Sequence, residues 1–94
     1  MTRDVICEAI EKRLEVSIVY SGSQRAVEPH ILGYNAKGAL ILSAWQASGG
    51  SGQGWRDFFV DKIASITLGQ THFLARPGYN SDDSTLSQII CRLQ

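Results

Sequence analysis

This chain of 94 residues lacks an excess of charge of either sign, because nine lysines and arginines balance nine aspartates and glutamates. No net field therefore draws it toward nucleic acid or a membrane. It also lacks an apolar run approaching the roughly 18 residues of a transmembrane helix, so no membrane partner is expected. Charged residues interrupt the start of the chain. A secretory signal peptide is therefore not expected, and the predicted location is cytoplasmic.

Cysteine and histidine are scarce. Cys7 and Cys91 each lie among apolar residues at helical spacing, and in a cytoplasmic chain they are expected to be buried thiols rather than a disulfide. His30 and His72 have no partner at the spacing of metal ligands. No serine lies in a nucleophile elbow, and no acid pair lies in an apolar setting. We therefore expect no metal, no cofactor and no enzymatic activity.

Two segments carry apolar residues at helical spacing, and they lie at the two ends of the chain. Residues 2–15 predict an N-terminal helix, with acidic Asp4 in its first turn. Residues 82–93 predict a C-terminal helix, which begins with acids and ends with Arg92. The apolar stripe of this second helix consists of Leu86, Ile89, Ile90 and Leu93.

Between these helices, five segments rich in β-branched and aromatic residues predict strands, separated by turn signals. They are Val16–Tyr20, Arg25–Leu32, Ala39–Gln46, Trp55–Val60 and Ala64–Leu68. Pro29 lacks a backbone donor, which predicts an edge or a bulge. Residues 61–63 predict a tight corner, and residues 71–80 an irregular segment. The chain is therefore expected to form one domain, residues 1–94, that is mainly β: a small five-stranded, partly open barrel over about 16–68 with flanking helices.

An ordered set of short motifs resembles the WYL domain, a bacterial sensor module with an Sm-like, SH3-type β-barrel. Residues 25–29, Arg-Ala-Val-Glu-Pro, resemble its R-x-V-x-P segment, and residues 56–63 resemble its closing R-x-F-x-L-D-R-I. The family's name-giving tripeptide is replaced by Leu40-Ile41-Leu42, which removes its tyrosine. The likeness covers about residues 5–68. WYL domains commonly follow a DNA-binding domain, and none precedes this one, so a stand-alone copy is expected.

The resemblance implies a basic binding site on the barrel. In the family, basic residues there hold nucleic acid or a nucleotide-like ligand, which here assigns Arg25 and Arg56 to an anionic group. Tyr20 and Phe58 would be their apolar neighbours and could stack on bases. The alternative is that both arginines are surface residues paired with acids. Those acids would be Glu28, Asp57 or Asp61.

A glycine-rich segment, residues 48–54, suggests a phosphate-binding loop but lacks the lysine and hydroxyl residue that end such a motif. A strand follows it rather than a helix, so no helix N-terminus is available for an anion. It is interpreted as a flexible hairpin loop that could move over a ligand.

The resemblance thus implies a non-catalytic regulatory module that senses a nucleotide or binds single-stranded nucleic acid. The alternative is a protein–protein interaction module that forms homo-oligomers or docks on a separately encoded regulator. Open sheet edges and the apolar stripe of the predicted C-terminal helix favour that alternative. An Sm-like RNA-binding ring is the weakest of the three, because the chain has no clearly basic loop.

Overall fold

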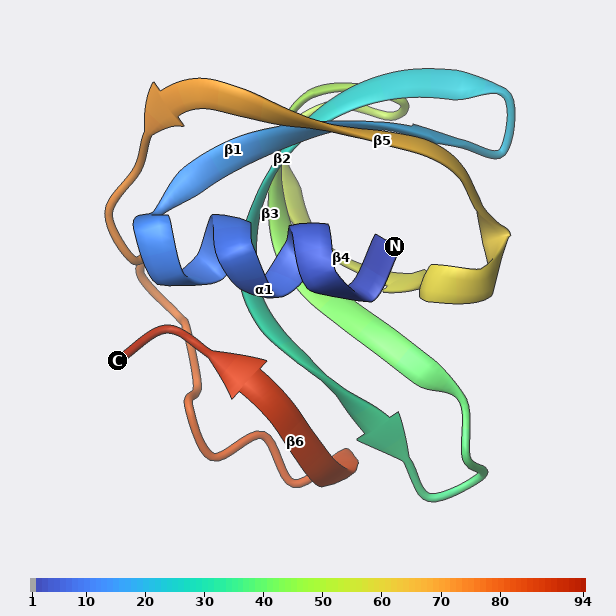
Figure 1. Ribbon diagram of the computed structural model, residues 1–94, viewed down its shortest axis with the longest axis vertical. Coiled ribbons are helices and arrows are strands. Elements are labelled where there is room, and N and C mark those ends of the chain that lie inside the picture. The colour runs from blue at the N-terminus through green and yellow to red at the C-terminus, as the bar shows by residue number, and fades with distance from the viewer. Residues whose placement is uncertain (1) are drawn as a thin grey trace.

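The computed structural model describes residues 2–94. Within that range the protein has one α-helix, six antiparallel strands and one short 3-10 turn (Figure 1). In chain order the elements are α1 (Thr2–Lys12), β1 (Leu14–Tyr20), β2 (Ser23–Asn35), β3 (Leu40–Gly49), β4 (Gly54–Phe59), η1 (Val60–Lys62), β5 (Ile63–His72) and β6 (Leu86–Arg92). No helix within residues 2–94 is long and apolar enough to cross a membrane.

The strands form one open sheet in the order β4-β3-β2-β1-β5, and β6 pairs separately with β2. The long strand β2 organises this arrangement. Its first half lies between β1 and β3, and its second half lies between β6 and β3. The β2–β3 register shifts between Pro29 and Ile31. The predicted bulge at Pro29 is therefore confirmed, since a residue without an amide proton fits where the ladder is interrupted.

Helix α1 packs against β1, β2, β5 and β6, and Figure 1 shows β1 and β5 on one side of it and β6 on the other. Its predicted apolar stripe is confirmed, because Ile6, Ala9 and Ile10 are buried. They join a core formed mainly by alternate strand residues, including Val16, Ile18, Val27, Leu32, Leu42 and Phe58. The predicted helix ran too far, to residue 15. Arg13 adopts a left-handed φ of 57°, and Leu14 already begins β1.

The five predicted strands are present in the predicted order. Strands β1, β2 and β5 are longer than predicted, β3 starts and ends later than predicted, and β4 starts and ends one residue earlier. The predicted corner at 61–63 is present as η1. Strand β3 lies between β2 and β4, which agrees with its nearly continuous apolar sequence.

The predicted C-terminal helix over 82–93 is wrong, because this segment forms β6, a sixth strand. The backbone of β6 pairs with the second half of β2, which β1 leaves uncovered. Gly33 permits the approach, since a Cβ at this position would lie 2.6 Å from the Gln88 carbonyl oxygen. Leu86 and Leu93 are still buried. The helical spacing of the apolar residues did not decide the secondary structure of this segment. Pairing with β2 supplies its backbone hydrogen bonds, and its isoleucines favour a strand.

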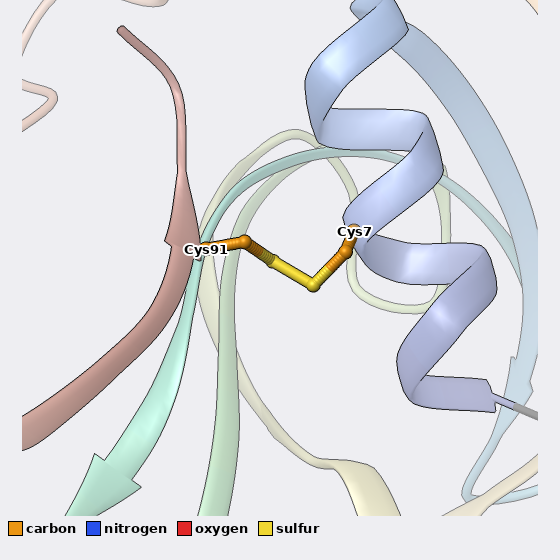
Figure 2. Close-up of a disulfide and its surroundings, with 2 residues drawn as sticks. All are labelled: Cys7 and Cys91. Atoms are coloured by element: carbon orange, nitrogen blue, oxygen red, sulfur yellow. A yellow bond between two sulfur atoms is a disulfide. The ribbon is translucent and has the colours of Figure 1, made fainter.

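The expectation of two buried free thiols is also wrong. Cys7 of α1 and Cys91 of β6 form a disulfide across 84 residues of sequence, with their Cα atoms 5.8 Å apart (Figure 2). Pairing of β6 with β2 brings Cys91 beside α1, which no local pattern indicated. Disulfides persist mainly in oxidising compartments. This bond therefore argues against the cytoplasmic location, which remains a prediction.

Candidate functional site

Three of the four predicted site residues lie together where β1, β2 and β4 meet. The rings of Tyr20 and Phe58 pack edge to face with centroids 4.8 Å apart. The guanidinium carbon of Arg25 lies 5.5 Å from the Tyr20 centroid and 5.8 Å from that of Phe58. A cation held over two aromatic rings gains from their quadrupoles. Phe58 is buried, so it supplies the floor of this group.

Only two of the three guanidinium nitrogens of Arg25 form hydrogen bonds within the protein. Its Nη2 donates to the Tyr20 carbonyl oxygen and its Nη1 donates to Gln46 Oε1, each at 3.1 Å. Its Nε is buried and has no hydrogen-bond partner within residues 2–94. Buried donors are usually satisfied, so this N–H is an unpaired buried donor beside two aromatic rings.

Arg56 lies on β4, where it contacts the glycine loop, residues 49–54, rather than the aromatic pair. Its Nη1 donates to the Trp55 carbonyl oxygen at 2.8 Å. Its Nη2 donates to Ser51 Oγ at 2.9 Å and to the Gly52 carbonyl oxygen at 3.2 Å. These contacts hold the loop against Arg56 in this conformation. The flexibility that its composition suggests stays a prediction.

Gln46 connects the two arginines through the same loop. It is fully buried, accepts from Arg25, and donates to the carbonyl oxygens of Gly49 at 2.9 Å and Gly52 at 2.7 Å. The loop approaches Arg25 so closely that a Cβ on Gly50, where φ is +53°, would lie 2.9 Å from the guanidinium carbon. Because glycine has no side chain, the loop comes close enough for its neutral carbonyl oxygens to accept hydrogen bonds from Gln46 and Arg56. We refer to these three side chains together as the Arg25–Gln46–Arg56 row.

The alternative prediction, that these two arginines form ion pairs with acids, does not hold among the described residues. Among residues 2–94, neither Arg25 nor Arg56 forms an ion pair. Glu28, one of the acids expected to pair with them, binds Arg76 instead. Two guanidinium charges therefore flank the glycine loop without a carboxylate partner.

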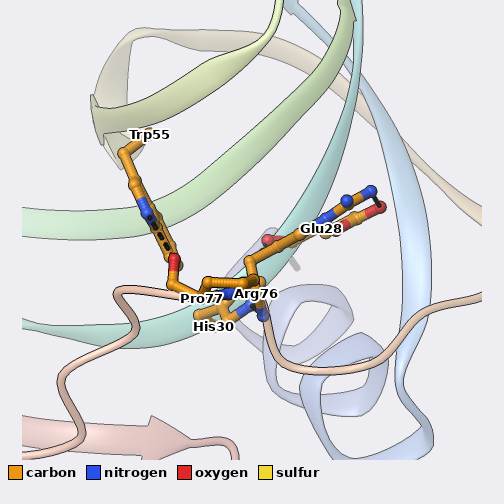
Figure 3. Close-up of polar contacts among 5 residues, drawn as sticks. All are labelled: Glu28, His30, Trp55, Arg76 and Pro77. Atoms are coloured by element: carbon orange, nitrogen blue, oxygen red, sulfur yellow. Dashed lines mark hydrogen bonds and ion pairs between the residues drawn. The ribbon is translucent and has the colours of Figure 1, made fainter.

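A second polar cluster, which the sequence did not indicate, surrounds Glu28 on the middle of β2 (Figure 3). Arg76 binds this carboxylate at two points, through Nε at 2.8 Å and Nη2 at 3.0 Å. The Arg76 backbone N–H donates to His30 Nε2 at 3.1 Å, and His30 Nδ1 lies 2.7 Å from the Glu28 carbonyl oxygen. These contacts require a neutral imidazole with its proton on Nδ1. Burial lowers the pKa of His30.

Aromatic side chains enclose this cluster. The His30 ring packs against Trp55, Phe73 and Tyr79 at centroid distances of 4.8, 5.2 and 5.1 Å. Trp55 Nε1 donates to the Pro77 carbonyl oxygen at 3.3 Å. The cluster therefore attaches the irregular segment 73–85 to the sheet. The turn-rich sequence at Arg76–Tyr79 was a visible signal for a structural element here, but its partner Glu28, 48 residues away, was not.

The histidines are not brought together as metal ligands. His30 is enclosed by aromatic rings, whereas His72 is exposed at the end of β5. Within residues 2–94, no group of three or more histidine, cysteine, aspartate or glutamate side chains is placed to hold a metal ion.

Comparison of the chain with models of known families, with characterised proteins and with solved structures found no match.

Proposed function

We propose that this protein is a non-catalytic regulatory module of WYL type, which binds a nucleotide or single-stranded nucleic acid at the Arg25–Gln46–Arg56 row. The observation that carries the proposal is the pair of guanidinium groups that flank the glycine loop without a carboxylate partner among the described residues. Phosphate oxygens accept charge-assisted hydrogen bonds, which are about twice as strong as bonds to neutral carbonyl oxygens. A phosphate group can therefore displace the neutral oxygens that these donors now bind, which are the Gly52 carbonyl oxygen at Arg56 and the Gln46 and Tyr20 oxygens at Arg25.

The aromatic neighbours give the site a second element. Tyr20 and Phe58 lie beside Arg25, and the Tyr20 ring is only half-buried. Aromatic rings and guanidinium planes are the surfaces on which single-strand-binding proteins stack bases. The combination of an uncompensated cation with an accessible ring favours a ligand that has both a phosphate and a base.

The chain path supports the barrel part of this proposal. β1 pairs with both β2 and β5, and the long β2 carries register shifts that allow the sheet to curl around α1. We regard this as an Sm-like barrel in which β6 has been added to the second half of β2. The expected absence of catalysis remains part of the same proposal.

Binding of labelled single-stranded oligonucleotides, measured by fluorescence anisotropy, tests this function, with nucleotides as competitors. Arg25→Ala and Arg56→Ala should each weaken binding at least ten-fold, because charge-assisted bonds contribute about 1.5–3 kcal/mol. Arg92→Ala is the matched control, since it removes an arginine on β6. Circular dichroism should show that the variants remain folded. Unchanged affinity in both site variants would contradict the proposal.

A protein–protein interaction module is the second candidate, and two features favour it. β4 and β5 end the strand path, so neither has a second strand neighbour within residues 2–94. Phe59 is 41% exposed and Leu74 is 81% exposed. Free sheet edges invite pairing with another chain, either a second copy or a separately encoded regulator. The apolar stripe of the expected C-terminal helix no longer supports this candidate, because β6 buries Leu86 on its own sheet.

Sedimentation velocity over a wide concentration range tests self-association. A monomer at every concentration, together with oligonucleotide binding, would favour the first function. Concentration-dependent dimers that persist in Arg25→Ala and Arg56→Ala would favour the second.

A further inference from the structure

We propose that segment 73–85 is a strap that opens in acid: it lies closed on the sheet while His30 is neutral and lifts when His30 takes up a proton. Two hydrogen bonds define the closed form. His30 Nδ1 donates to the Glu28 carbonyl oxygen at 2.7 Å, and His30 Nε2 accepts the Arg76 backbone N–H at 3.1 Å (Figure 3). Both ring nitrogens are therefore in use, and Nε2 holds the strap.

A protonated His30 and a closed strap exclude each other at Nε2. An imidazolium donates from both nitrogens, so a proton on Nε2 would point at the Arg76 N–H, donor against donor. The His30 ring is fully buried and packs against Trp55, Phe73 and Tyr79. Turning the ring toward another acceptor would displace these side chains. Phe73 and Tyr79 belong to the strap, so lifting the strap is the motion that frees Nε2.

The groups around the imidazole also disfavour a second cation there. Burial has the largest effect and lowers the pKa of His30, and the charges of Arg76 in the strap and Arg13 after α1 lower it further. Glu28 on β2 acts in the opposite direction, but its carboxylate already binds Arg76 at two points. Burial raises the pKa of the Tyr79 hydroxyl, so this group stays neutral in acid.

The strap is attached to the sheet by few side chains, which favours local opening. Phe73 is its one buried residue, and Leu74 is 81% exposed. A cavity of about 170 Å³ is lined by strap residues, including Tyr79, and by sheet residues, including Ile31 and Trp55. Segments with few buried contacts open at a lower free energy than the rest of a fold. The strap can therefore lift while the sheet stays intact.

The sign of the pH dependence follows from the two forms. In the open form His30 has its ordinary pKa of about 6.5, whereas the closed form takes up a proton only at lower pH. The ratio of open to closed strap therefore rises as the pH falls. From pH 7.5 to 5 the rise should be several-fold, with a ceiling of about 30-fold if the closed form takes up no proton in this range.

Amide hydrogen exchange of the 94-residue chain, followed by NMR at pH 7.5 and 5, tests the strap. Each exchange rate is divided by the intrinsic rate at the same pH. Protection of the Arg76 amide should fall by the factor given above and should not respond to low urea concentrations. Amides of the central strand β3 should stay better protected at both pH values. The proposal is overturned if Arg76 protection does not change with pH, or if the strap and β3 share one protection and one urea dependence.

The protonation state of His30 gives a second readout that needs no variant. Long-range proton–nitrogen spectra at pH 7.5 should show a neutral ring with its proton on Nδ1. A proton on Nε2 would contradict the proposal, because Nε2 could not then accept from Arg76.

Variants then assign the pH response. His30→Gln should abolish it, because glutamine does not titrate. His72→Gln, which removes an exposed histidine at the end of β5, should leave it unchanged. Glu15→Gln should also leave it unchanged, although burial raises the pKa of Glu15 beside the Glu28–Arg76 pair. A response that is lost in either control but kept in His30→Gln would contradict the proposal.

Trp55→Phe keeps the test decisive if His30→Gln does not fold. It removes the indole N–H that is donated to the Pro77 carbonyl oxygen at 3.3 Å but retains an aromatic ring. The strap should then open more often at every pH, with the same pH dependence. An unchanged protection of the strap in Trp55→Phe would show that these contacts do not hold it. None of these measurements depends on ligand binding at Arg25.

Discussion

Glu28 and Arg76 form an ion pair with two contacts, of 2.8 and 3.0 Å, although they lie 48 residues apart. The Glu28 side chain is only 3% exposed, whereas that of Arg76 is 41% exposed. The carboxylate has therefore lost nearly all of its water, and Arg76 is its charge partner. Because Arg76 also donates its backbone N–H to His30, this pair attaches the segment 73–85 to the middle of β2.

Removal of Arg76 should destabilise the protein more than removal of both members of the pair. Arg76→Ala leaves a buried, unpaired carboxylate, whereas Arg76→Ala combined with Glu28→Gln removes that charge. The urea midpoint should therefore be lowest for the single arginine variant. The double variant should recover part of the loss. A double variant that is no more stable than Arg76→Ala would show that the buried charge is not the cause.

Stability should fall on mild acidification because of His30. Its pKa is lowered in the folded state by burial, so the unfolded chain binds a proton at a higher pH than the folded chain. This contribution is fully present above the unfolded pKa of about 6.5 and is lost as the pH falls through the folded value. Urea unfolding between pH 7.5 and 5 measures it. His72→Gln should keep the pH dependence, whereas His30→Gln should weaken it. An equal response of both variants would contradict the assignment to His30.

The Cys7→Ser/Cys91→Ser double variant should be less stable by about 2–5 kcal/mol, because the disulfide closes a long loop in the unfolded chain. The thermal midpoint should fall by on the order of 10–20 °C. The wild-type protein in a strong reductant is the matched comparison and should show the same midpoint as the variant. Equal midpoints for oxidised and reduced wild-type protein would mean that the bond adds nothing to stability.

Gly33→Ala should weaken the attachment of β6. The new Cβ would lie 2.6 Å from the Gln88 carbonyl oxygen, and backbone cannot move aside as a flexible side chain can. The expected cost is about 1–3 kcal/mol, as for other overpacked sites. Amide hydrogen exchange should rise in β6, and Ser65→Ala on exposed β5 is the control. Uniform loss of protection across the sheet would argue instead for a global effect.

Much of the antiparallel sheet could be predicted because its signals are local. The alternation around Ile18 and Phe58, the turn at residues 21–22 and the amide-free Pro29 each restrict the backbone over a few residues. The candidate site was predictable only in part. Tyr20, Phe58 and Arg25 lie together, but Arg56 meets Arg25 only through Gln46 and the glycine loop. Gln46 carried no signal, because a lone glutamine in an apolar strand does not reveal which carbonyl oxygens it will reach.

The amino-acid sequence by itself determined the N-terminal helix, the order of the first five strands and the corner at η1, because short-range periodicity and turn chemistry select those conformations. Tertiary structure decided the state of residues 86–92, whose apolar spacing also suits a helix. Pairing with the uncovered half of β2 made them a strand, and that strand brought Cys91 to Cys7. The Glu28–Arg76 pair was decided in the same way. Contacts between residues 48 or 84 apart depend on the path of the whole chain, which no local window of sequence contains.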